Sequence, residues 1–377
     1  MAELSLVVIG LTLSSSWGNG HATTYRALLR GLARRGAEIT FLERDVPWYC
    51  DHRDLPEPDF ARLELYSGLG DLNARFGKLV RQADAVLIGS YVPDGVAVID
   101  WALGTAKGPV VFYDIDTPIT LAQLDGGKQD YLAKRQIPHF DLYLSFTGGP
   151  ILNRLQKRYR ARKARALYCT VDTANYRPRR NRNPIRHLGY LGTYSDDRQP
   201  ALERLLIEPA RLRPDLSFVV AGPQYPETIA WPPNVERIDH LPPGKHPRFY
   251  DSQRFTLNVT RARMIAAGWS PSVRLFEAAA CGTPIISDRW DGLAELFPLG
   301  EAILIADTCE DVLGYLELPE AKRRAVGEAA REIVLTSHRA EVRAAQLETL
   351  LDQARGAKTA PPRQRARLRG YATIAGN

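Results

Sequence analysis

Short apolar runs alternate with segments of helical periodicity along the first half of the chain. Residues 4–9 are continuously apolar, which is typical of a strand buried on both faces of a parallel sheet. The polar, glycine-containing loop 14–21 follows, and apolar residues then recur at helical spacing from 25 to 32. Gly36 ends this helix before a second apolar run at 38–42. The order of strand, helix and strand predicts a βαβ unit.

Three further apolar runs continue this pattern. They lie at 85–89, 109–113 and 141–146, and the segments between them are long enough for crossover helices. We therefore predict a parallel sheet that is covered by helices on both faces. The alternation stops at 175–184, where two prolines and many polar residues interrupt any regular element.

A second alternation of the same kind begins after this interruption. Its apolar runs lie at 187–192, 216–223, 255–259 and 282–288, and a helix is predicted from about 200 to 212. The predicted fold class is therefore α/β, with two Rossmann-like domains that face each other across a cleft. Such a pair places a ligand between the carboxyl ends of the two sheets. The predicted units are a first domain at 1–182, a second at 183–340, and a C-terminal helix with a basic flexible tail at 341–377.

The composition is that of an ordinary globular chain. Of the 377 residues, 45% are hydrophobic and 25% are charged, which excludes a chain that is disordered throughout. No apolar run approaches the roughly 20 residues that cross a bilayer. The amino-terminal sequence lacks the pattern of a secretory signal, so we expect a cytoplasmic protein. The four cysteines form no C-x-x-C pair, and neither a disulfide framework nor a structural zinc site is indicated.

The net charge of +7 is distributed unevenly along the chain. Residues 154–186 contain twelve Lys and Arg against one acid, and the segment 358–377 contains five with no acid. Because the rest of the chain is acidic overall, a general nucleic-acid-binding surface is not expected. Two interpretations of the basic segments stay open: a solvated surface, or a docking site for an anionic acceptor or a membrane surface.

The most specific stretch is S-P-S-V-R-L-F-E-A-A-A-C-G-T-P-I-I-S-D at 270–288. A helix that begins at Ser272 offers free backbone N–H groups and the positive end of its dipole to a phosphate. Glu277 lies in the apolar part of this helix, where a carboxylate needs hydrogen-bond donors. The two hydroxyls of a ribose are such donors. The stretch therefore predicts a nucleotide site.

This stretch resembles the nucleotide-sugar-binding helix of GT-B glycosyltransferases, and the phrases around it resemble the CgeB-like, spore-maturation-protein-type branch of that superfamily. The resemblance is strongest over 185–310 and continues through F-Y-D-I-D-T-P at 112–118 and D-L-Y-L-S-F-T-G-G-P at 141–150. It implies a GT-B fold, a nucleoside-diphosphate sugar as donor, and no bound metal or other cofactor. In the superfamily, the glutamate that matches Glu277 holds the ribose of the donor.

Two positions depart from the family's pattern. Trp269 stands where the large retaining branch carries a second glutamate near the transferred sugar. Thr193 stands where an arginine usually contacts the donor diphosphate, and Arg198 is the basic group left in that loop. A guanidinium suits the role because it donates two parallel hydrogen bonds. Arg261 and Arg274 are second choices for it.

The turn D-H-L-P-P-G at 239–244 resembles the base-binding loop of the family, which implies that His240 and Leu241 flank the nucleobase. Its prolines would preset the backbone and reduce the entropy lost on binding. A second turn, at Gly148 and Gly149 before a predicted helix, is a candidate for a phosphate-facing or interdomain contact.

Candidates for the acceptor side follow two strands of the first domain. Gly18 and Gly20 would let the backbone approach a ligand, and His21 would enter the cleft as a general base or an oxyanion contact. Asp116 follows a later strand and is the second candidate base, with N-capping of the next helix as the alternative. Asp114 and Asp116 also have the spacing of a D-x-D metal motif, because residues i and i+2 share one face of a strand.

These features predict a metal-independent glycosyltransferase that moves a sugar from a nucleoside diphosphate to a hydroxyl acceptor, with UDP favoured over dTDP and GDP. Two alternatives stay open at this point. One is a nucleotide-sugar epimerase of the same fold, and the other is a non-catalytic protein that binds an anionic polymer or a membrane surface. A dehydrogenase is poorly supported, since no G-x-G-x-x-G follows the first strand of either domain.

Overall fold

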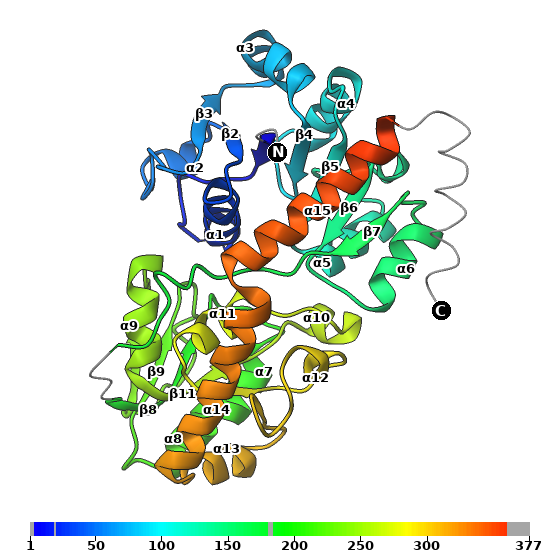
Figure 1. Ribbon diagram of the computed structural model, residues 1–377. Coiled ribbons are helices and arrows are strands. Elements are labelled where there is room, and N and C mark those ends of the chain that lie inside the picture. The colour runs from blue at the N-terminus through cyan, green and yellow to red at the C-terminus, as the bar shows by residue number, and fades with distance from the viewer. Residues whose placement is uncertain (1–3, 19, 180–183, 360–377) are drawn as a thin grey trace.

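Two parallel sheets form the two halves of the molecule (Figure 1). The computed structural model describes residues 4–18, 20–179 and 184–359. The first sheet has the strand order β3-β2-β1-β4-β5-β6-β7, and the second has the order β10-β9-β8-β11-β12-β13. In each sheet the first strand is central. The chain adds the next two strands on one side of it and then crosses over to add the remaining strands on the other side. This is the doubly wound arrangement of a Rossmann-like domain. The predicted α/β class with two such domains is confirmed.

The first domain alternates strands and helices along the chain. Its strands are β1 (Ser5–Gly10), β2 (Glu38–Arg44), β3 (Arg62–Tyr66), β4 (Ala85–Gly89), β5 (Val110–Asp114), β6 (Leu142–Ser145) and β7 (Ala164–Ala166). Its helices are α1 (His21–Ala33), α2 (Pro47–Cys50), α3 (Leu69–Gln82), α4 (Gly95–Thr105), α5 (Thr117–Asp125) and α6 (Pro150–Lys157), with a 3₁₀ turn at Lys134–His139.

The second domain repeats this alternation with shorter elements. Its strands are β8 (Arg186–Leu191), β9 (Phe218–Ala221), β10 (Val235–Ile238), β11 (Gln253–Asn258), β12 (Ile285–Ser287) and β13 (Leu304–Ile305). Its helices are α7 (Gln199–Leu202), α8 (Glu208–Leu212), α9 (His246–Asp251), α10 (Ala262–Ala267), α11 (Val273–Ala280), α12 (Leu293–Leu296), α13 (Cys309–Leu316) and α14 (Glu320–Ile333). A π-helical turn at Glu203–Ile207 joins α7 to α8, so the helix predicted from about 200 to 212 is one interrupted helix.

Strand β1 shows why a continuous apolar run is the right sequence for a central strand. Leu6 and Val8 pack into the apolar cluster on one face of the sheet, and Val7 and Ile9 pack into the cluster on the other. None of the four is more than 1% exposed. Because successive side chains of a strand point to opposite faces, both faces of β1 are core.

The last helix returns to the first domain. After a π-helical turn at Val334–His338, α15 (Ala340–Thr359) runs from the second domain across α1 (Figure 1). Two ion pairs of 2.7 Å join α15 to the residues that end α1, from Glu341 to the C-cap Arg34 and from Glu348 to Arg35. The predicted domain boundary at 182/183 lies outside the described residues, as does the predicted basic tail beyond residue 359. The first two residues of that tail, 358 and 359, are the end of α15.

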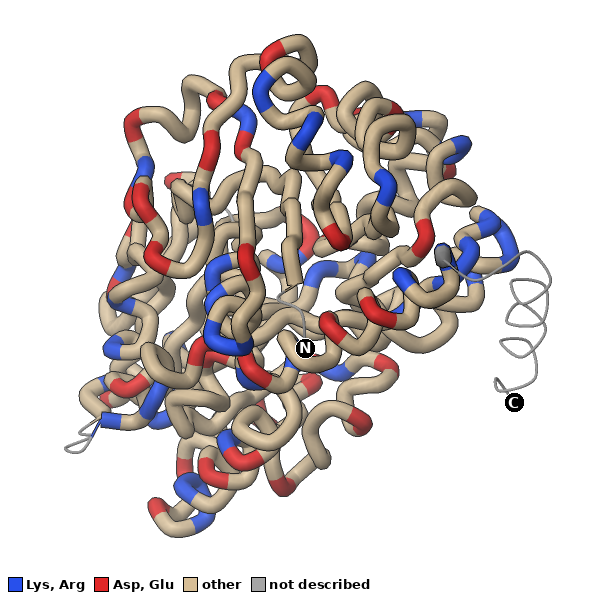
Figure 2. The backbone as a smooth tube through the Cα atoms, turned by 45° about the horizontal axis from the view of Figure 1, so that its top comes forward, with Lys and Arg blue, Asp and Glu red and all other residues tan. Residues whose placement is uncertain are grey.

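Along the backbone, positions of Lys and Arg are interspersed with positions of Asp and Glu (Figure 2). In the basic stretch, Arg154 and Arg158 both pair with Asp125, and Arg162 pairs with Asp141. Acids from other elements therefore neutralise part of this stretch. Within the described ranges, no helix combines the length and the apolar character that crossing a bilayer requires.

Candidate active site

One cleft between the two domains collects the residues singled out from the sequence. It opens where the carboxyl ends of the two sheets face each other, and its volume of about 380 Å³ is that of a small-molecule site. The first domain contributes Gly18, Gly20, His21 and Asp116 to its wall. The second domain contributes Thr193, Arg198, His240, Leu241, Arg261, Ser272, Arg274 and Glu277. The structure thus brings these twelve candidates together, while the ligand contact of each one stays a prediction.

Glu277 lies on α11 and is only 3% exposed, yet it lines the cleft. The hydroxyl of Tyr250 donates to its Oε2 over 3.0 Å. The imidazole Nδ1 of His246 lies 3.4 Å from the same oxygen. The buried carboxylate is therefore supported from α9 rather than left without a partner, as the cost of burying a charge requires.

Sequence reasoning missed both supporting residues. His246 and Tyr250 are four positions apart on α9 and so lie on one face of that helix. The signal in the sequence is their spacing shortly after the turn 239–244. If that segment is taken to be a helix, the spacing places the histidine and the tyrosine on one face of it.

Three arginines line the second domain's part of the cleft, and they differ in what they already bind. Arg274 donates from Nε to the carbonyl of Leu191 over 2.6 Å and from Nη1 to Oδ1 of Asn258 over 2.8 Å. Because these bonds join the ends of β8 and β11, Arg274 has a structural task. Arg261 is half exposed and lies 3.8 Å from a carboxylate oxygen of Asp197.

Arg198 has hydrogen-bonding capacity that is both buried and unused. One terminal nitrogen donates to the carbonyl of Thr193 over 2.5 Å. Its Nε is buried and has no hydrogen-bond partner within the described part of the chain. Burial lowers the pKa of this guanidinium from its usual value, and the nearby cations Arg274 and Arg261 act in the same direction. An anion in the cleft would relieve both conditions.

The helix α11 begins at the cleft, as predicted. Its N-cap residue Ser272 has an extended backbone, and its hydroxyl donates to Asn258 over 2.8 Å instead of capping the helix. The first backbone N–H groups of α11 are therefore not capped by that side chain, and they lie at the positive end of the helix dipole.

The ends of β8 and β9 meet closely beside Thr193. Gly222 follows β9 with a φ of +143°, and a Cβ built on it would lie 2.0 Å from the carbonyl oxygen of Gly192, which follows β8. Only glycine fits this position without displacing the backbone that leads to Thr193. The sequence analysis did not single out this contact.

In the first domain, His21 is the first residue of α1 and faces Asp116, which precedes α5. The His21 Nε2 and an Asp116 carboxylate oxygen are 3.6 Å apart. The other ring nitrogen, Nδ1, is buried without a hydrogen-bond partner in the described ranges. Asp116 makes no side-chain cap to the helix it precedes, so the N-capping alternative is not what the geometry shows.

Asp114 has surroundings unlike those of Asp116. It is fully buried, and it accepts hydrogen bonds from the hydroxyls of Tyr143 at 2.6 Å and Thr120 at 2.7 Å. Burial raises the pKa of this carboxyl to about 6 against the opposing effect of those two bonds. The D-x-D spacing therefore does not place both carboxylates in the cleft. Among the described residues, no group of three or more potential ligands is arranged to hold a metal ion.

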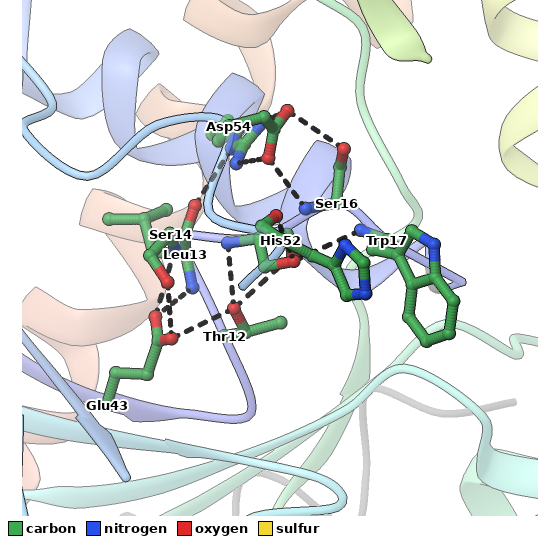
Figure 3. A network of polar contacts seen from close by, with 10 residues as sticks. Thr12, Leu13, Ser14, Ser16, Trp17, Glu43, His52 and Asp54 are labelled. Carbon is green, nitrogen blue, oxygen red and sulfur yellow. Dashed lines mark hydrogen bonds and ion pairs between the residues drawn. The ribbon is translucent and has the colours of Figure 1, made fainter. Parts of the chain in front are cut away.

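Two acids fix the loop that leads from β1 to His21 (Figure 3). Glu43, which is fully buried, accepts from the backbone N–H groups of Leu13 at 2.7 Å and Ser14 at 2.9 Å. Asp54 accepts from the backbone N–H and the hydroxyl of Ser16, both at 2.9 Å. These bonds tie residues 13–16 of the loop to β2 and to the segment that carries Asp54. Sequence reasoning missed Glu43, although an acid inside the apolar run 38–44 was a signal.

This loop presents an aromatic pair at the edge of the cleft (Figure 3). The indole of Trp17 is 47% exposed and stacks on the imidazole of His52, with ring centroids 4.4 Å apart and planes 13° from parallel. Its chain neighbours Ser16 and Gly18 both line the cleft.

Trp269 joins the two domains. Its indole packs so closely on Gly149 that a Cβ there would lie 2.5 Å from the ring, and its N–H donates to Glu295 over 2.8 Å. The backbone N–H of Gly148 donates to the Trp269 carbonyl over 3.0 Å. The predicted turn at these glycines is therefore an interdomain contact. The residue in place of the family's second glutamate is part of that contact.

Comparison with known proteins agrees with this architecture. Residues 198–349 match the model of a family described as glycosyl transferase-like. No curated protein matches the sequence. Among solved structures, HepE of Anabaena superposes with a TM-score of 0.68 at 12% identity, over 93% of this chain and 100% of that one. Sucrose-phosphate synthase of Thermosynechococcus elongatus gives 0.65 at 14% identity, over 93% and 99%.

An alpha-glucosyltransferase gives a TM-score of 0.67 at 14% identity, over 93% of this chain and 100% of that one. At these identities the likeness establishes the fold, which is that of the GT-B glycosyltransferases. The fold and the family match over the second domain together define the class of protein: it is a glycosyltransferase of GT-B architecture.

Proposed function

We propose that this glycosyltransferase transfers a sugar from a UDP-sugar to a hydroxyl acceptor without a bound metal, and that it belongs to the CgeB-like branch. The observation that carries the proposal is the position of Glu277, a carboxylate that is buried to 3% exposure and yet lines the interdomain cleft. A ribose diol supplies two hydroxyl donors for such a carboxylate. The pyrimidine would then lie against His240 and Leu241.

UDP is favoured because two proteins of the same fold are known as complexes with it. HepE of Anabaena has been solved with UDP and with UDP-glucose, and the alpha-glucosyltransferase with UDP. The dTDP and GDP alternatives remain as comparison ligands in the experiment below.

The diphosphate would lie between Arg198 and the first turn of α11. The buried Nε of Arg198 has a hydrogen to donate, and the first residues of α11 line the cleft. As the bond to the sugar breaks, negative charge grows on the departing diphosphate. Fixed cations and dipoles aimed at that charge lower the barrier without a metal ion.

The chemical step needs a base on the acceptor side, and the His21 and Asp116 pair supplies one. In the proposed step, this pair takes the proton from the acceptor hydroxyl, and the acceptor oxygen bonds to the anomeric carbon of the sugar. The bond from that carbon to the diphosphate oxygen breaks, and UDP leaves with the electron pair. The carboxylate of Asp116, 3.6 Å from the His21 Nε2, stabilises the imidazole when it is protonated.

The proposal is tested at Glu277. The substitution Glu277→Ala removes the two hydrogen bonds expected to the ribose, and because each is charge-assisted we expect UDP to bind about 100-fold more weakly. Isothermal titration calorimetry with UDP, dTDP and GDP measures the change. Glu236→Ala is the matched control. Glu236 lies on the edge strand β10, is half exposed and pairs with Arg186 of β8. It does not line the cleft.

Unchanged affinity for UDP in Glu277→Ala would count against the proposed site. Incubation of the wild-type protein with a UDP-sugar alone separates the alternative activities. A transferase releases UDP with water as acceptor, whereas an epimerase converts the sugar and leaves it on the nucleotide. A protein stabilised by none of the three nucleotides in thermal unfolding would be a binding protein instead.

A further inference from the structure

His246 is held between two hydrogen-bond acceptors. Its Nε2 lies 3.1 Å from the carbonyl oxygen of Leu241, and its Nδ1 lies 3.4 Å from Oε2 of Glu277. Neither a carbonyl nor a carboxylate oxygen can donate, so the ring bonds both neighbours at once only when each of its nitrogens carries a hydrogen. The geometry is therefore that of a doubly protonated, positively charged imidazole.

The groups around the ring agree with this charge. Glu277 faces it from α11 with a negative charge. The hydroxyl of Tyr176, 3.4 Å from Nδ1, can accept from that nitrogen or donate to it, and so fits either state of the ring. Tyr250 of the same helix directs its hydroxyl to Glu277. Burial by itself lowers the pKa of His246, but the charge of Glu277 and the hydrogen bonds to Glu277 and Leu241 outweigh it. The net effect raises that pKa above its usual 6.5.

The backbone fixes where this imidazole can go. His246 is the first residue of α9, after a 3₁₀ turn at Pro243–Lys245, and Pro247 follows it. Its side chain is 14% exposed, so it has little freedom to leave the two acceptors. One side chain thus touches both the carboxylate and the loop that the proposed function assigns to the ribose and the base.

We propose that His246 is a positioning residue of the nucleotide site: as a cation it orients the Glu277 carboxylate toward the ribose and holds the Leu241 backbone against the base, so that nucleotide affinity depends on its protonation. This inference rests on the proposed function and adds a coupling within the same site. The Glu277 and His246 pair is neutral overall, so the carboxylate does not add net repulsion against a diphosphate in the same cleft.

The sign of the pH dependence follows from the raised pKa. Below pH 6.5 the imidazole is charged in the folded protein, and the pair contributes fully to stability and to nucleotide affinity. Both contributions are lost as the pH rises through the higher pKa of the folded state. Because linkage is reciprocal, bound UDP must in turn raise the pKa of His246.

The test compares UDP affinity of the wild type, His246→Gln and the control His187→Gln from pH 5.5 to 9 by calorimetry. His187 lies on β8, and its ring contacts Ser217 outside the cleft. The ratio of variant to wild-type dissociation constant at each pH cancels the titration of the UDP phosphate. We expect His246→Gln to bind about tenfold more weakly at pH 6 and the ratio to approach one at pH 9. His187→Gln keeps a ratio of one throughout.

A second readout uses the wild-type protein and so does not depend on a variant that folds. Nuclear magnetic resonance titration of the imidazole gives the pKa of His246 with and without UDP, and in Glu277→Gln. We expect UDP to raise that pKa and Glu277→Gln to lower it, while Tyr176→Phe, which keeps both acceptors, shifts it less than Glu277→Gln does.

The outcomes separate the two proposals. If UDP fails to bind the wild type, or binds Glu277→Ala equally well, the proposed function is wrong. If UDP binding needs Glu277 but the His246→Gln ratio is one at every pH, or UDP leaves the pKa of His246 unchanged, the coupling through His246 is refuted and the proposed function stands.

Discussion

Asp114 and Asp116 follow the same strand but meet opposite surroundings. The strand β5 ends at Asp114, whose side chain turns into the core between the hydroxyls of Tyr143 and Thr120. The chain then leaves the sheet, so the rule that residues two apart share a face no longer applies to Asp116. One acid is structural and buried, and the other reaches His21 in the cleft.

Asp114 gives a prediction for the pH dependence of stability. Its carboxyl has a pKa of about 6 when folded against a usual 3.8, so between these values the folded protein holds a proton that the unfolded chain releases. The free energy of unfolding therefore falls as the pH rises through this window, by about 3 kcal/mol. Asp114→Asn cannot ionise and should remove this decrease, as urea unfolding at pH 4 and pH 7.5 would show.

The control for Asp114 is Asp239→Asn, at a side chain that is 97% exposed. Its unfolding curves should follow those of the wild type at both pH values. A decrease of the wild-type size in Asp114→Asn would show that another group causes the pH dependence.

Among single residues, those that could be predicted from the sequence are polar or charged side chains within apolar segments. Glu277 stood out because a carboxylate inside an apolar helix needs a partner. His246 and Tyr250 did not, because their importance lies in contacting Glu277, which is 31 and 27 positions away. The sequence shows that a residue differs from its neighbours along the chain. It does not show which residues from distant elements contact that residue in the folded protein.

The turns that follow β8 and β9 show how strand ends shape the cleft. These neighbouring parallel strands end in Gly192 and Gly222, and the two backbones touch with no room for a side chain at Gly222. The carbonyl of Gly192 also accepts a hydrogen bond from the hydroxyl of Tyr225 over 3.1 Å. The path of the chain into Thr193 and Arg198 depends on this contact.

We expect Gly222→Ala to destabilise the second domain by about 2–4 kcal/mol, because the new methyl group meets a backbone oxygen and φ is positive. UDP affinity should fall in the same variant, since the loop that carries Arg198 must move. Chemical unfolding and calorimetry measure the two effects. Gly314→Ala is the control, because that glycine lies in α13 with no atom within 4 Å of its Cβ position and helical Ala is favoured by up to about 1 kcal/mol. Equal stability of the two variants would contradict the prediction.

Among the elements, the strands next to the centre of each sheet were predicted and four others were missed: β3, β7, β10 and β13. All four missed strands are edge strands of their sheets, and all but β3 have at most four residues. In β3 the sequence R-L-E-L-Y mixes charged and apolar positions, because only Tyr66 of this edge strand is buried. Edge strands need less apolar surface, so a search for apolar runs passes over them.

The alternation of strands and helices occurs twice along the chain. For that reason the organisation into two similar domains could be predicted from the sequence. The return of α15 to the first domain could not be predicted in this way. An amphipathic pattern shows that a helix has a face to bury, but it does not show against which surface. The answer comes from the fold, where α1 of the first domain lies beside α15.

Leu347 tests whether this return stabilises the first domain. The residue lies in α15 and is fully buried, in the same apolar cluster as Leu28 and Leu32 of α1. Leu347→Ala leaves a cavity at that interface and should cost about 2–5 kcal/mol. We expect the amides of α1 to exchange hydrogen faster in this variant, while those of β9 in the second domain keep their wild-type rates. Leu212→Ala, at a leucine that is 57% exposed, should change neither set. The rate at which an amide exchanges reports the contacts that must break for its element to unfold locally. Faster exchange confined to the second domain would therefore show that Leu347 stabilises the second domain and not the first.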